Sequence, residues 1–416
     1  MLASVTDASR PPRPTRRIAH LDMDAFYASV ELLRYPQLTG LPLVIGGGRR
    51  AADAALERAH PGVAPAELPV AAFPRLRDYA GRGVVTTATY AARQYGVGSA
   101  MGLMKAAQRC PDAILLPVDF DAYRRCSRAF KAVITEIAPV MEDRGIDEVY
   151  IDFTDVPGGQ REGGRVLARL IQKGIFDATG LTCSIGVAPN KLLAKMASEF
   201  NKPNGISIVQ PADLEPRIWP LPCRKINGIG PKTDEKLQAL GVHTIGELAA
   251  QPLDALLEHF GQSLGHWLHH AAWGRDDRPL HTHSEPVSLS RETTFERNLH
   301  PVRDRADLSA QFTRLSEQVA ADLQRKGYRG RSVAVKLRFD DFRVVTRHHR
   351  LPAPVDQAEA ILWAARQALK RAPLERPLRL LGVRVDGLLR RGEPDEAAPL
   401  PTARPDEHDD LQGRLF

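Results

Sequence analysis

Two apolar segments that carry acids near their ends constrain this chain more than any other feature. The segment 18–27 begins as an apolar strand with Asp22 near the end of that strand, and residues 145–152 repeat the pattern with Asp147 and Glu148. An unpaired carboxylate is costly to bury, so each needs a cation, a hydrogen-bond donor or water. Three carboxylates that meet at the ends of neighbouring strands would repel one another. Divalent metal ions relieve such repulsion, and the sequence therefore predicts a metal site at one end of a sheet.

The two adjacent acids set a geometric condition. Neighbouring side chains on a regular strand face opposite ways, so Asp147 and Glu148 converge only if the strand bends, which Gly145 permits. Any one of these acids alone could be a surface residue or a cap. Mg²⁺ prefers oxygen ligands, and two such ions suit phosphoryl transfer. Asp24 is interpreted instead as the N-cap of a helix over 25–34.

The composition indicates a multidomain protein with a polyanionic partner. A length of 416 residues suggests two to four domains at roughly 100 to 200 residues each. Lys and Arg exceed Asp and Glu by 57 − 50 = +7, whereas residues 391–416 hold three Arg against seven acids, a net of −4. A basic body with an acidic tail favours a polyanion such as nucleic acid, although an ordinary basic enzyme stays open.

Several classes of protein are disfavoured. The four cysteines form no CxxC pair, so we expect free thiols in a reducing cytoplasm. Residues 1–17 are rich in Pro and Arg without an apolar stretch, so they are not a secretory signal, and no apolar run could span a bilayer. His266, His269 and His270 lack a further ligand and are interpreted as a solvated helix face.

Strand and helix signals alternate up to about residue 200, which predicts an α/β core. Strands are expected at 17–23, 43–46, 83–86, 140–153 (a pair) and 181–187, and helices at 25–34, from about 90, and at 121–138, 162–178 and 191–200.

The second half of the chain changes character. Short helices joined by Gly turns are expected over 205–275, and a β-rich unit begins near Val287. Its strand 333–339 places Val333, Val335, Leu337 and Phe339 on one face and Lys336 and Arg338 on the other. The last strand is expected at 378–385.

Several motifs, in the right order, resemble those of Y-family DNA polymerases, most closely the DinB or DNA polymerase IV branch. The opening motif is 22–31, the triphosphate-binding fingers motif 87–97, the second metal motif 146–152, and the palm lysine motif 184–195, closed by 201–205. The likeness covers about residues 16–390. Gly145 departs from it, because these enzymes often carry Ser there.

The resemblance implies a multidomain α/β fold: a right-hand polymerase with palm, fingers, a helical thumb with a helix-hairpin-helix, and an α+β little finger. The expected domains are a disordered N-terminus 1–15, palm 16–25 and 119–198, fingers 26–118, thumb 199–275, linker 276–287, little finger 288–390 and a disordered tail 391–416. Residues 49–80 are longer than expected, and a tolerated surface insertion is favoured over a partner site.

The resemblance also implies the catalytic residues. Asp22, Asp147 and Glu148, with the backbone carbonyl of Met23, would hold two Mg²⁺ ions in each active site. Tyr27 lies five residues after Asp22 and would act as a steric gate, because its ring would leave no room for a ribose 2′-hydroxyl. Plain helix packing is the alternative for Tyr27.

The triphosphate would bind at a helix start. Tyr90 and Arg93 are three residues apart, hence on one helix face, where free N–H groups favour anions. Thr87 precedes them, and Lys191 at another helix start would add a cation. Without the resemblance, Arg93 and Lys191 would be interpreted as solvated surface charges.

DNA contacts are expected in two places. Gly228, Gly230 and Lys232 lie in a segment that resembles a helix-hairpin-helix turn, whose glycines let backbone N–H groups approach a phosphate. Residues 325–350 hold nine Lys or Arg against two Asp, a net of +7, and there Lys336 and Arg338 could follow phosphates. An ordinary solvated sheet face is the alternative.

The last residues resemble the peptide by which bacterial polymerases dock on the sliding clamp. Gln412 would anchor that peptide, and Leu415 and Phe416 would enter a pocket on the clamp's beta subunit. The acidic, Pro-rich segment before them would act as a tether.

The sequence thus predicts a monomeric, cytoplasmic, low-fidelity DNA polymerase for translesion synthesis, which uses primer-template DNA and dNTPs and has no membrane partner. No separate stretch is left for a proofreading nuclease. Two alternatives stay open. A DNA-binding scaffold with an inactive palm would not need the intact acids, and a nucleotide cyclase would not need the thumb turn or the clamp-like tail.

Overall fold

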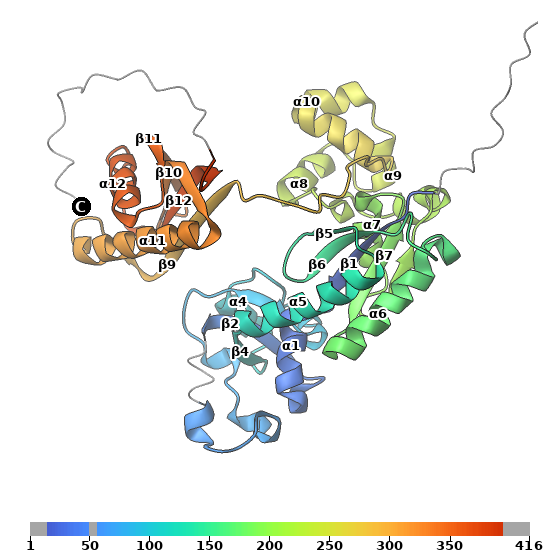
Figure 1. Ribbon diagram of the computed structural model, residues 1–416, viewed down its shortest axis with the longest axis horizontal. Helices are drawn as coiled ribbons and strands as arrows, with labels where there is room; N and C mark the ends of the chain where they lie inside the picture. Colours follow the sequence, from blue (N-terminus) through green and yellow to red (C-terminus); the bar gives the residue numbers. More distant parts are fainter. Residues whose placement is uncertain (1–14, 50–55, 394–416) are drawn as a thin grey trace, which may run out of the picture. The chain divides into compact units, whose positions relative to one another are not determined.

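The computed structural model describes residues 15–49 and 56–393. Contacts divide the chain into two compact units, Met1–His283 and Ser284–Phe416 (Figure 1). Each unit has its own hydrophobic cores.

The central sheet of the first unit has the strand order β5-β6-β1-β7-β8. These strands are β1 (Ile18–Met23), β5 (Met141–Asp143), β6 (Glu148–Asp152), β7 (Cys183–Ala188) and β8 (Ile206–Ile208). β1 is antiparallel to both of its neighbours. Its position between them explains why every residue of β1 except Asp22 is buried.

Helices lie on both faces of this sheet, and the more apolar face packs against two long helices. Helices α5 (Phe120–Ile137) and α6 (Arg165–Thr179) share one core with alternate residues of β1, namely Ala19, Leu21 and Met23 (Figure 1). On the other face α7 (Lys191–Ser198) packs against β1 and β7.

A smaller sheet follows the order β3-β2-β4. It consists of β2 (Leu43–Arg49), β3 (Val85–Ala88) and β4 (Ile114–Val118), and the helices near it are α1 (Phe26–Arg34), α3 (Tyr90–Arg93) and α4 (Leu103–Arg109). Three 3-10 turns, Pro65–Glu67, Val70–Ala72 and Leu76–Asp78, lie in the predicted insertion.

The described part of that insertion is not a simple surface loop. Phe73 is 2% exposed and meets the ring of Tyr35 edge-on at 5.1 Å, and Leu76 is fully buried. This stretch therefore supplies core side chains, contrary to the interpretation as a tolerated surface insertion. An Ala- and Pro-rich composition gave no apolar period from which to predict that packing.

The remainder of the first unit is helical, as predicted. It comprises α8 (Pro231–Ala239), α9 (Ile245–Ala249) and α10 (Leu253–Ala272). Thr244 and Glu247 form a reciprocal capping box at the start of α9. Gly261, at φ 77°, interrupts the helical backbone of α10.

The second unit is a four-stranded sheet, order β11-β10-β12-β9, with two helices on one face. Its elements are β9 (Ser288–Leu299), α11 (Arg305–Lys326), β10 (Tyr328–Phe339), β11 (Val344–Val355), α12 (Ala358–Leu369) and β12 (Leu378–Arg390). Val333, Val335, Leu337 and Phe339 all enter the core beneath the helices, which confirms the predicted alternation.

The sequence pattern located most strands but missed several elements. Helices α11 and α12 and strands β4 and β8 were not predicted. The predicted strand 83–86 is found two residues later, at Val85–Ala88. Within the described part of the chain, no helix is both long and apolar enough to cross a membrane.

Candidate active site

The three predicted acids come from the end of the central sheet. Asp22 on β1 is the register partner of Glu148 on β6. Asp147 lies just before β6, and its carbonyl accepts a hydrogen bond from the Met23 amide at 3.0 Å. Because regular pairing begins at Glu148, Asp147 is outside the strand's strict alternation. The start of β6 therefore provides the departure from regular strand geometry that Asp147 and Glu148 need in order to face the same way.

Two lysines neutralise these acids. Lys202 donates to the Asp22 Oδ1 at 2.6 Å and also contacts Glu199 at 2.8 Å, while Lys195 donates to the Glu148 carboxylate. Across the described residues, no three His, Cys, Asp or Glu side chains are gathered closely enough to hold a metal ion. Asp22 and Glu148 are therefore each paired with a different lysine, Lys202 and Lys195 respectively.

Burial makes two of the three acids harder to ionise. Burial raises the pKa of Asp22, and Lys202 only partly offsets it; burial and the charge of Glu148 raise the pKa of Asp147. Glu148 differs, because its hydrogen bond with His20 and its pairing with Lys195 lower its pKa to about 2 despite burial. The pKa values of Asp22 and Asp147 are thus raised, whereas that of Glu148 is lowered. A cation bound between the three would stabilise all of them as carboxylates.

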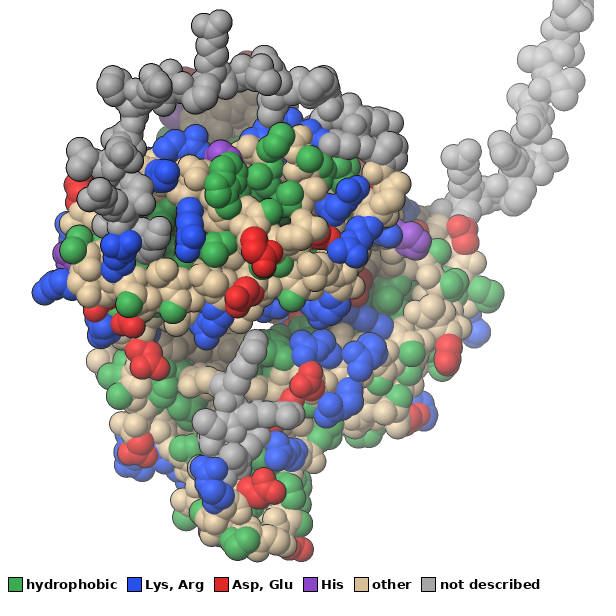
Figure 2. Space-filling view, turned by 60° about the vertical axis from the view of Figure 1, so that its left-hand side comes forward, with side chains coloured by type: hydrophobic (Ala, Val, Ile, Leu, Met, Phe, Trp, Pro, Cys, Tyr) green, Lys and Arg blue, Asp and Glu red, His purple; other side chains and the backbone are tan. Residues whose placement is uncertain are grey.

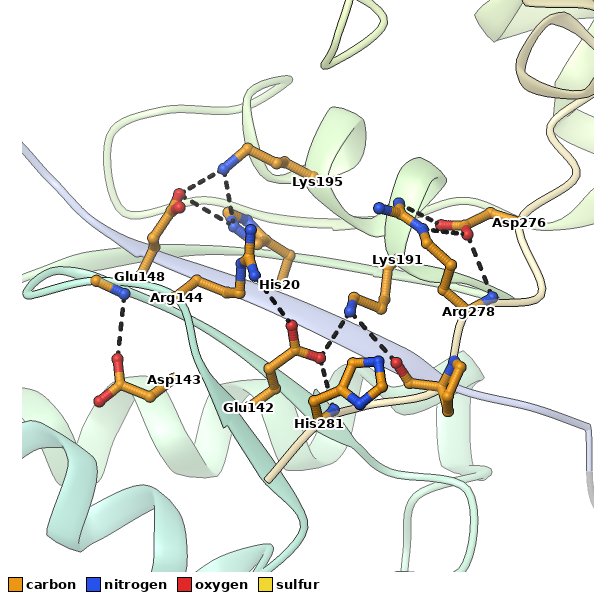
Figure 3. Close-up of polar contacts among 12 residues, drawn as sticks. His20, Glu142, Asp143, Arg144, Glu148, Lys191, Lys195, Asp276, Arg278 and His281 are labelled. Carbon is orange, nitrogen blue, oxygen red and sulfur yellow. Dashed lines mark hydrogen bonds and ion pairs between the residues drawn. The ribbon is translucent and has the colours of Figure 1, made fainter. Parts of the chain in front are cut away.

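His20 lies beneath the cluster and was not predicted. Its ring is fully buried between the Ser198 hydroxyl, at 2.8 Å from Nδ1, and Glu148 and Lys195, each 3.4 Å from Nε2 (Figure 3). Burial lowers its pKa, which favours the neutral ring. His20 thus acts as a hydrogen-bonding support for Glu148.

The predicted gate residue Tyr27 is held in an aromatic stack. Its ring lies parallel to that of Tyr123 at 4.2 Å and meets Phe120 edge-on at 5.9 Å. The Tyr123 hydroxyl in turn donates to Glu31 at 2.7 Å. Burial and the nearby charge of Asp147 raise the pKa of Tyr27, so the ring lies close to the acid cluster. This packing leaves the ring little freedom to move.

The predicted triphosphate residues lie beside β3. Tyr90 begins α3, and its buried hydroxyl has no hydrogen-bond partner among the described residues. Burial, followed by the charge of Asp24, raises the pKa of Tyr90 to about 12. Arg93 lies over the Tyr90 ring at 4.8 Å and donates from Nε to the Ala88 carbonyl. Thr87 is buried on β3.

Lys191 lies elsewhere than the sequence suggested. Its ammonium donates to Glu142 Oε2 at 2.6 Å and to the Pro279 carbonyl at 3.3 Å (Figure 3). The Lys191 and Glu142 side chains are only 5% and 3% exposed. The His281 amide donates to the same Glu142 carboxylate. Lys191 therefore fastens the segment after α10 to β5.

Asp24 does not cap α1, contrary to the prediction. The N-cap is Ala25, in the left-handed region at φ 44° and without a side-chain cap. The Asp24 carboxylate instead accepts hydrogen bonds from Ser184 Oγ at 2.7 Å and from the Asn204 amide at 2.8 Å. The position of Asp24 just before the helix suggested a cap, but its side chain instead bonds to Ser184 and Asn204, which lie far away in the sequence.

A cavity of about 380 Å³ opens beside Glu148 and reaches the predicted thumb turn. It is lined mainly by polar and basic side chains, which are Arg144, Glu148, Tyr150, Lys191, Lys195, Asn227 and Arg278, with Leu192, Gly228 and Trp267.

At Gly228 the predicted thumb turn adopts a backbone conformation that favours glycine. Gly228 has φ 116°, and a Cβ there would lie 2.7 Å from the Trp267 ring. Gly230 is the N-cap of α8, and Lys232 in its first turn is exposed. This turn thus offers open backbone and a cation to a neighbouring phosphate.

In the second unit, Lys336 and Arg338 lie half-buried on β10, on the face opposite the helices. Lys336 donates to Glu292 at 2.8 Å, and the Arg338 Nε is buried without a partner among the described residues. Figure 2 shows many Lys and Arg side chains on one side of the surface, mixed with fewer acids. Gln412, Leu415 and Phe416 lie outside the described residues.

Sequence reasoning missed the roles of His20, Lys195 and Lys202. Lys195 follows Lys191 by four residues, one helical turn, on a helix that packs on β1, so its reach toward Glu148 could have been inferred. Lys202 lies beyond the end of α7, and no period in the sequence predicts its contact with Asp22.

Three segments match known family models. Residues 21–199 match the impB/mucB/samB family, residues 211–242 the HHH motif of the IMS family, and residues 286–400 the C-terminal domain of the impB/mucB/samB family.

Relatives match over nearly the whole chain. A protein named DNA polymerase IV from Alkalilimnicola ehrlichii is 38% identical over 92% of this chain and 98% of its own length. Another, from Methanoculleus marisnigri, is 36% identical over 90% of this chain and 95% of its own. Among solved structures, a Y-family DNA polymerase chimera of Dbh and Dpo4 has a TM-score of 0.73 at 25% identity, covering 90% of this chain and 100% of that one. DinB from Sulfolobus solfataricus shares the fold, with a TM-score of 0.58 at 24% identity and the same coverage of both chains.

Proposed function

Because this chain belongs to the impB/mucB/samB family and is a DNA-directed DNA polymerase of the Y family, we propose that it extends primers past damaged template bases, with low fidelity, by two-metal phosphoryl transfer. Primer-template DNA and dNTPs are its substrates. The predicted right-hand fold with a helix-hairpin-helix thumb is confirmed. The observation that supports the mechanism is the pairing of Asp22 with Glu148 at one end of the sheet.

The donor set fits divalent cations. Asp22, Asp147 and Glu148, with the Met23 carbonyl, would hold two Mg²⁺ ions, because they are oxygen donors and a bound cation would offset the cost of ionising the buried Asp22 and Asp147. Two bound ions would activate the primer 3′-hydroxyl and neutralise the leaving pyrophosphate. Lys195 and Lys202 compensate the charge of Glu148 and Asp22.

The incoming dNTP would lie over the acids, with its triphosphate between Tyr90, Arg93 and Lys202. The unpartnered Tyr90 hydroxyl supports this proposal, since a buried polar group without a partner is costly unless a ligand supplies one. We assign the second cationic contact to Lys202 in place of Lys191, because Lys202 reaches Asp22 whereas Lys191 is committed to Glu142. Thr87 would support the β3 end of this site.

The primer strand would follow the basic cavity beside Glu148. Arg144, Lys195 and Arg278 line it, and the thumb turn at Gly228 closes one side, so a phosphate backbone would meet both cations and open backbone N–H groups. Gly230 and Lys232 would extend that contact. Lys336 and Arg338 would hold DNA on the sheet of the little finger.

The remaining parts of the proposal concern organisation. We assign the palm to 16–25 and 119–198, fingers to 26–118, thumb to 199–275, linker to 276–287 and little finger to 288–390.

The polymerase would work as a monomer in the cytoplasm, with Gln412, Leu415 and Phe416 docked on the sliding clamp. Deleting 412–416 should spare extension of bare primer-template but abolish stimulation by the clamp.

A double substitution tests the proposed chemistry. Asp147→Ala with Glu148→Ala should lower primer extension by a factor on the order of 10³ or more, since removing one charge-stabilising group alone can cost 10² to 10³. Binding of primer-template, measured by fluorescence anisotropy, should change little. Asp143→Asn, which alters an exposed acid paired with Lys131, is the matched control and should keep full activity. Extension that survives the double substitution would refute the metal-site assignment.

A further inference from the structure

The Asp24 carboxylate joins three parts of the active site. It is 3% exposed, and both of its oxygens accept hydrogen bonds, Oδ1 from the Ser184 hydroxyl and Oδ2 from the Asn204 amide. Ser184 on β7 is the register partner of Asp22. Asn204 follows Lys202 by two residues, so the two bonds of Asp24 connect the strand that carries Asp22 to the segment that carries its cation.

We propose that Asp24 is a positioning residue for dNTP binding, acting through Lys202. Its carboxylate holds the segment 202–205 against β7, so that the Lys202 ammonium stays at Asp22. This inference rests on the proposed function, in which Lys202 contacts the triphosphate.

The segment 202–205 depends on this anchor. It leaves α7 beyond Ser198 and joins β8 at Ile206. Gly205 contributes a weaker bond, from its amide to Ser184 Oγ at 3.4 Å, and its carbonyl accepts from the Ile185 amide at 2.9 Å. The Asn204 amide bond to Asp24 is shorter and charge-assisted, and hence stronger.

A Lys202 side chain that is held in place should bind dNTP more tightly than one that moves freely. A lysine side chain loses much rotamer freedom when it binds a phosphate, and a fixed backbone lowers that loss. Removing the anchor should therefore weaken dNTP binding more than it slows the chemical step, because the acids themselves stay on their strands. The signature is a rise in KM for dNTP with a smaller change in kcat.

The test is single-nucleotide incorporation at saturating primer-template and Mg²⁺. Lys202→Ala should raise KM for dNTP roughly 10-fold or more, and Asp24→Ala should raise it by about the same factor with kcat within about 3-fold. Asp24→Asn should stay within about 3-fold of the parent in KM, because its amide can accept from the Asn204 N–H and donate to Ser184 Oγ.

The decisive comparison is the double variant. If Asp24 acts through Lys202, Asp24→Ala in the Lys202→Ala background should raise KM by no more than about 2-fold further. Asp119→Ala, which removes another buried aspartate that caps α5, is the control for general destabilisation and should leave KM unchanged. If Asp24→Ala does not fold, Ser184→Ala replaces it in the same comparison with Lys202→Ala.

The outcomes separate the two proposals. An unchanged KM for Lys202→Ala would refute the triphosphate role of Lys202 and with it the proposed dNTP site. A raised KM for Lys202→Ala with a normal KM for Asp24→Ala would refute the positioning role alone. Effects that multiply in the double variant would also overturn it, because Asp24 would then act independently of Lys202.

Discussion

At the scale of single residues, Tyr27 offers the sharpest test. Its ring is stacked on Tyr123 and flanked by Phe120, which leaves it little freedom to move; we propose that it contacts the sugar of an incoming nucleotide. We predict that Tyr27→Ala admits ribonucleotides and lowers sugar discrimination by about 10-fold or more, the scale on which a pocket of changed size loses selectivity. The measurement is the ratio of kcat/KM for dNTP and rNTP in single-nucleotide assays.

The matched control is Tyr123→Phe, which keeps the stacking ring but removes the hydroxyl that donates to Glu31. It should leave sugar discrimination unchanged. If the Tyr27→Ala variant rejects ribonucleotides as strongly as the parent does, Tyr27 serves only in helix packing.

The same scale shows what the sequence could predict about the site. Asp22 and Glu148 were found because an acid at the end of an apolar strand is conspicuous, and their register pairing brings them together. Asp24 was misassigned, because its spacing before α1 matches a cap, whereas its partners Ser184 and Asn204 lie 160 and 180 residues away. Contacts at such distances follow from the folded topology, which local patterns do not encode.

At the scale of elements, the Lys191–Glu142 pair fastens residues 274–281 to the central sheet. Lys191 also holds the Pro279 carbonyl, and Asp276 accepts from the amide of Leu192 in the first turn of α7. Removing one partner of a buried pair leaves the other charge unpaired, which typically costs about 3–5 kcal/mol. We predict that Lys191→Met lowers stability and exposes this segment to trypsin, detected as faster cleavage after Arg275.

Lys131→Met, which breaks the more exposed pair with Asp143, serves as the control and should cost under about 1 kcal/mol without new cleavage. Equal cleavage of the Lys191→Met variant and the parent would show that other contacts hold the segment.

The same pair predicts a dependence on pH. Burial alone would raise the pKa of Glu142, but hydrogen bonds from Lys191 and the His281 amide outweigh it, so the pKa lies below its ordinary 4.5. A carboxyl with a lowered folded pKa stabilises the fold above its unfolded pKa and loses that contribution as pH falls through the folded pKa. The melting temperature of Lys191→Met should therefore approach that of the parent as pH falls below 4.5. A gap that stays constant as the pH is lowered well below 4.5 would contradict the role of the Glu142 charge.

Element prediction succeeded where a strand alternates cleanly between apolar and polar residues. The alternation of 333–339 predicted β10 correctly, because that strand covers a helical layer. Helices α11 and α12 were not predicted, although apolar residues at helical spacing bury one face of each. The segment before β3 gave no period at all, although Phe73 and Leu76 are buried.

At the scale of the whole molecule, charge decides how DNA binding responds to salt. The chain carries +7 overall, and binding that neutralises phosphates releases counterions, so affinity falls steeply with salt. Lys336 is paired with Glu292 and would have to exchange that partner for a phosphate, whereas the Arg338 Nε has no partner among the described residues. We predict that Lys336→Ala with Arg338→Ala reduces the slope of log K against log salt by roughly 1 to 2.

The control is Arg169→Ala with Lys173→Ala, which removes two exposed cations of α6, each paired with a nearby acid. It changes the net charge by the same amount, so a general charge effect would alter both double variants equally. A local contact alters only the β10 variant. Anisotropy titrations of a primer-template duplex from 50 to 200 mM salt, a range over which such binding changes strongly, distinguish the two cases. Equal slopes for both variants would mean that the β10 face does not contact phosphates.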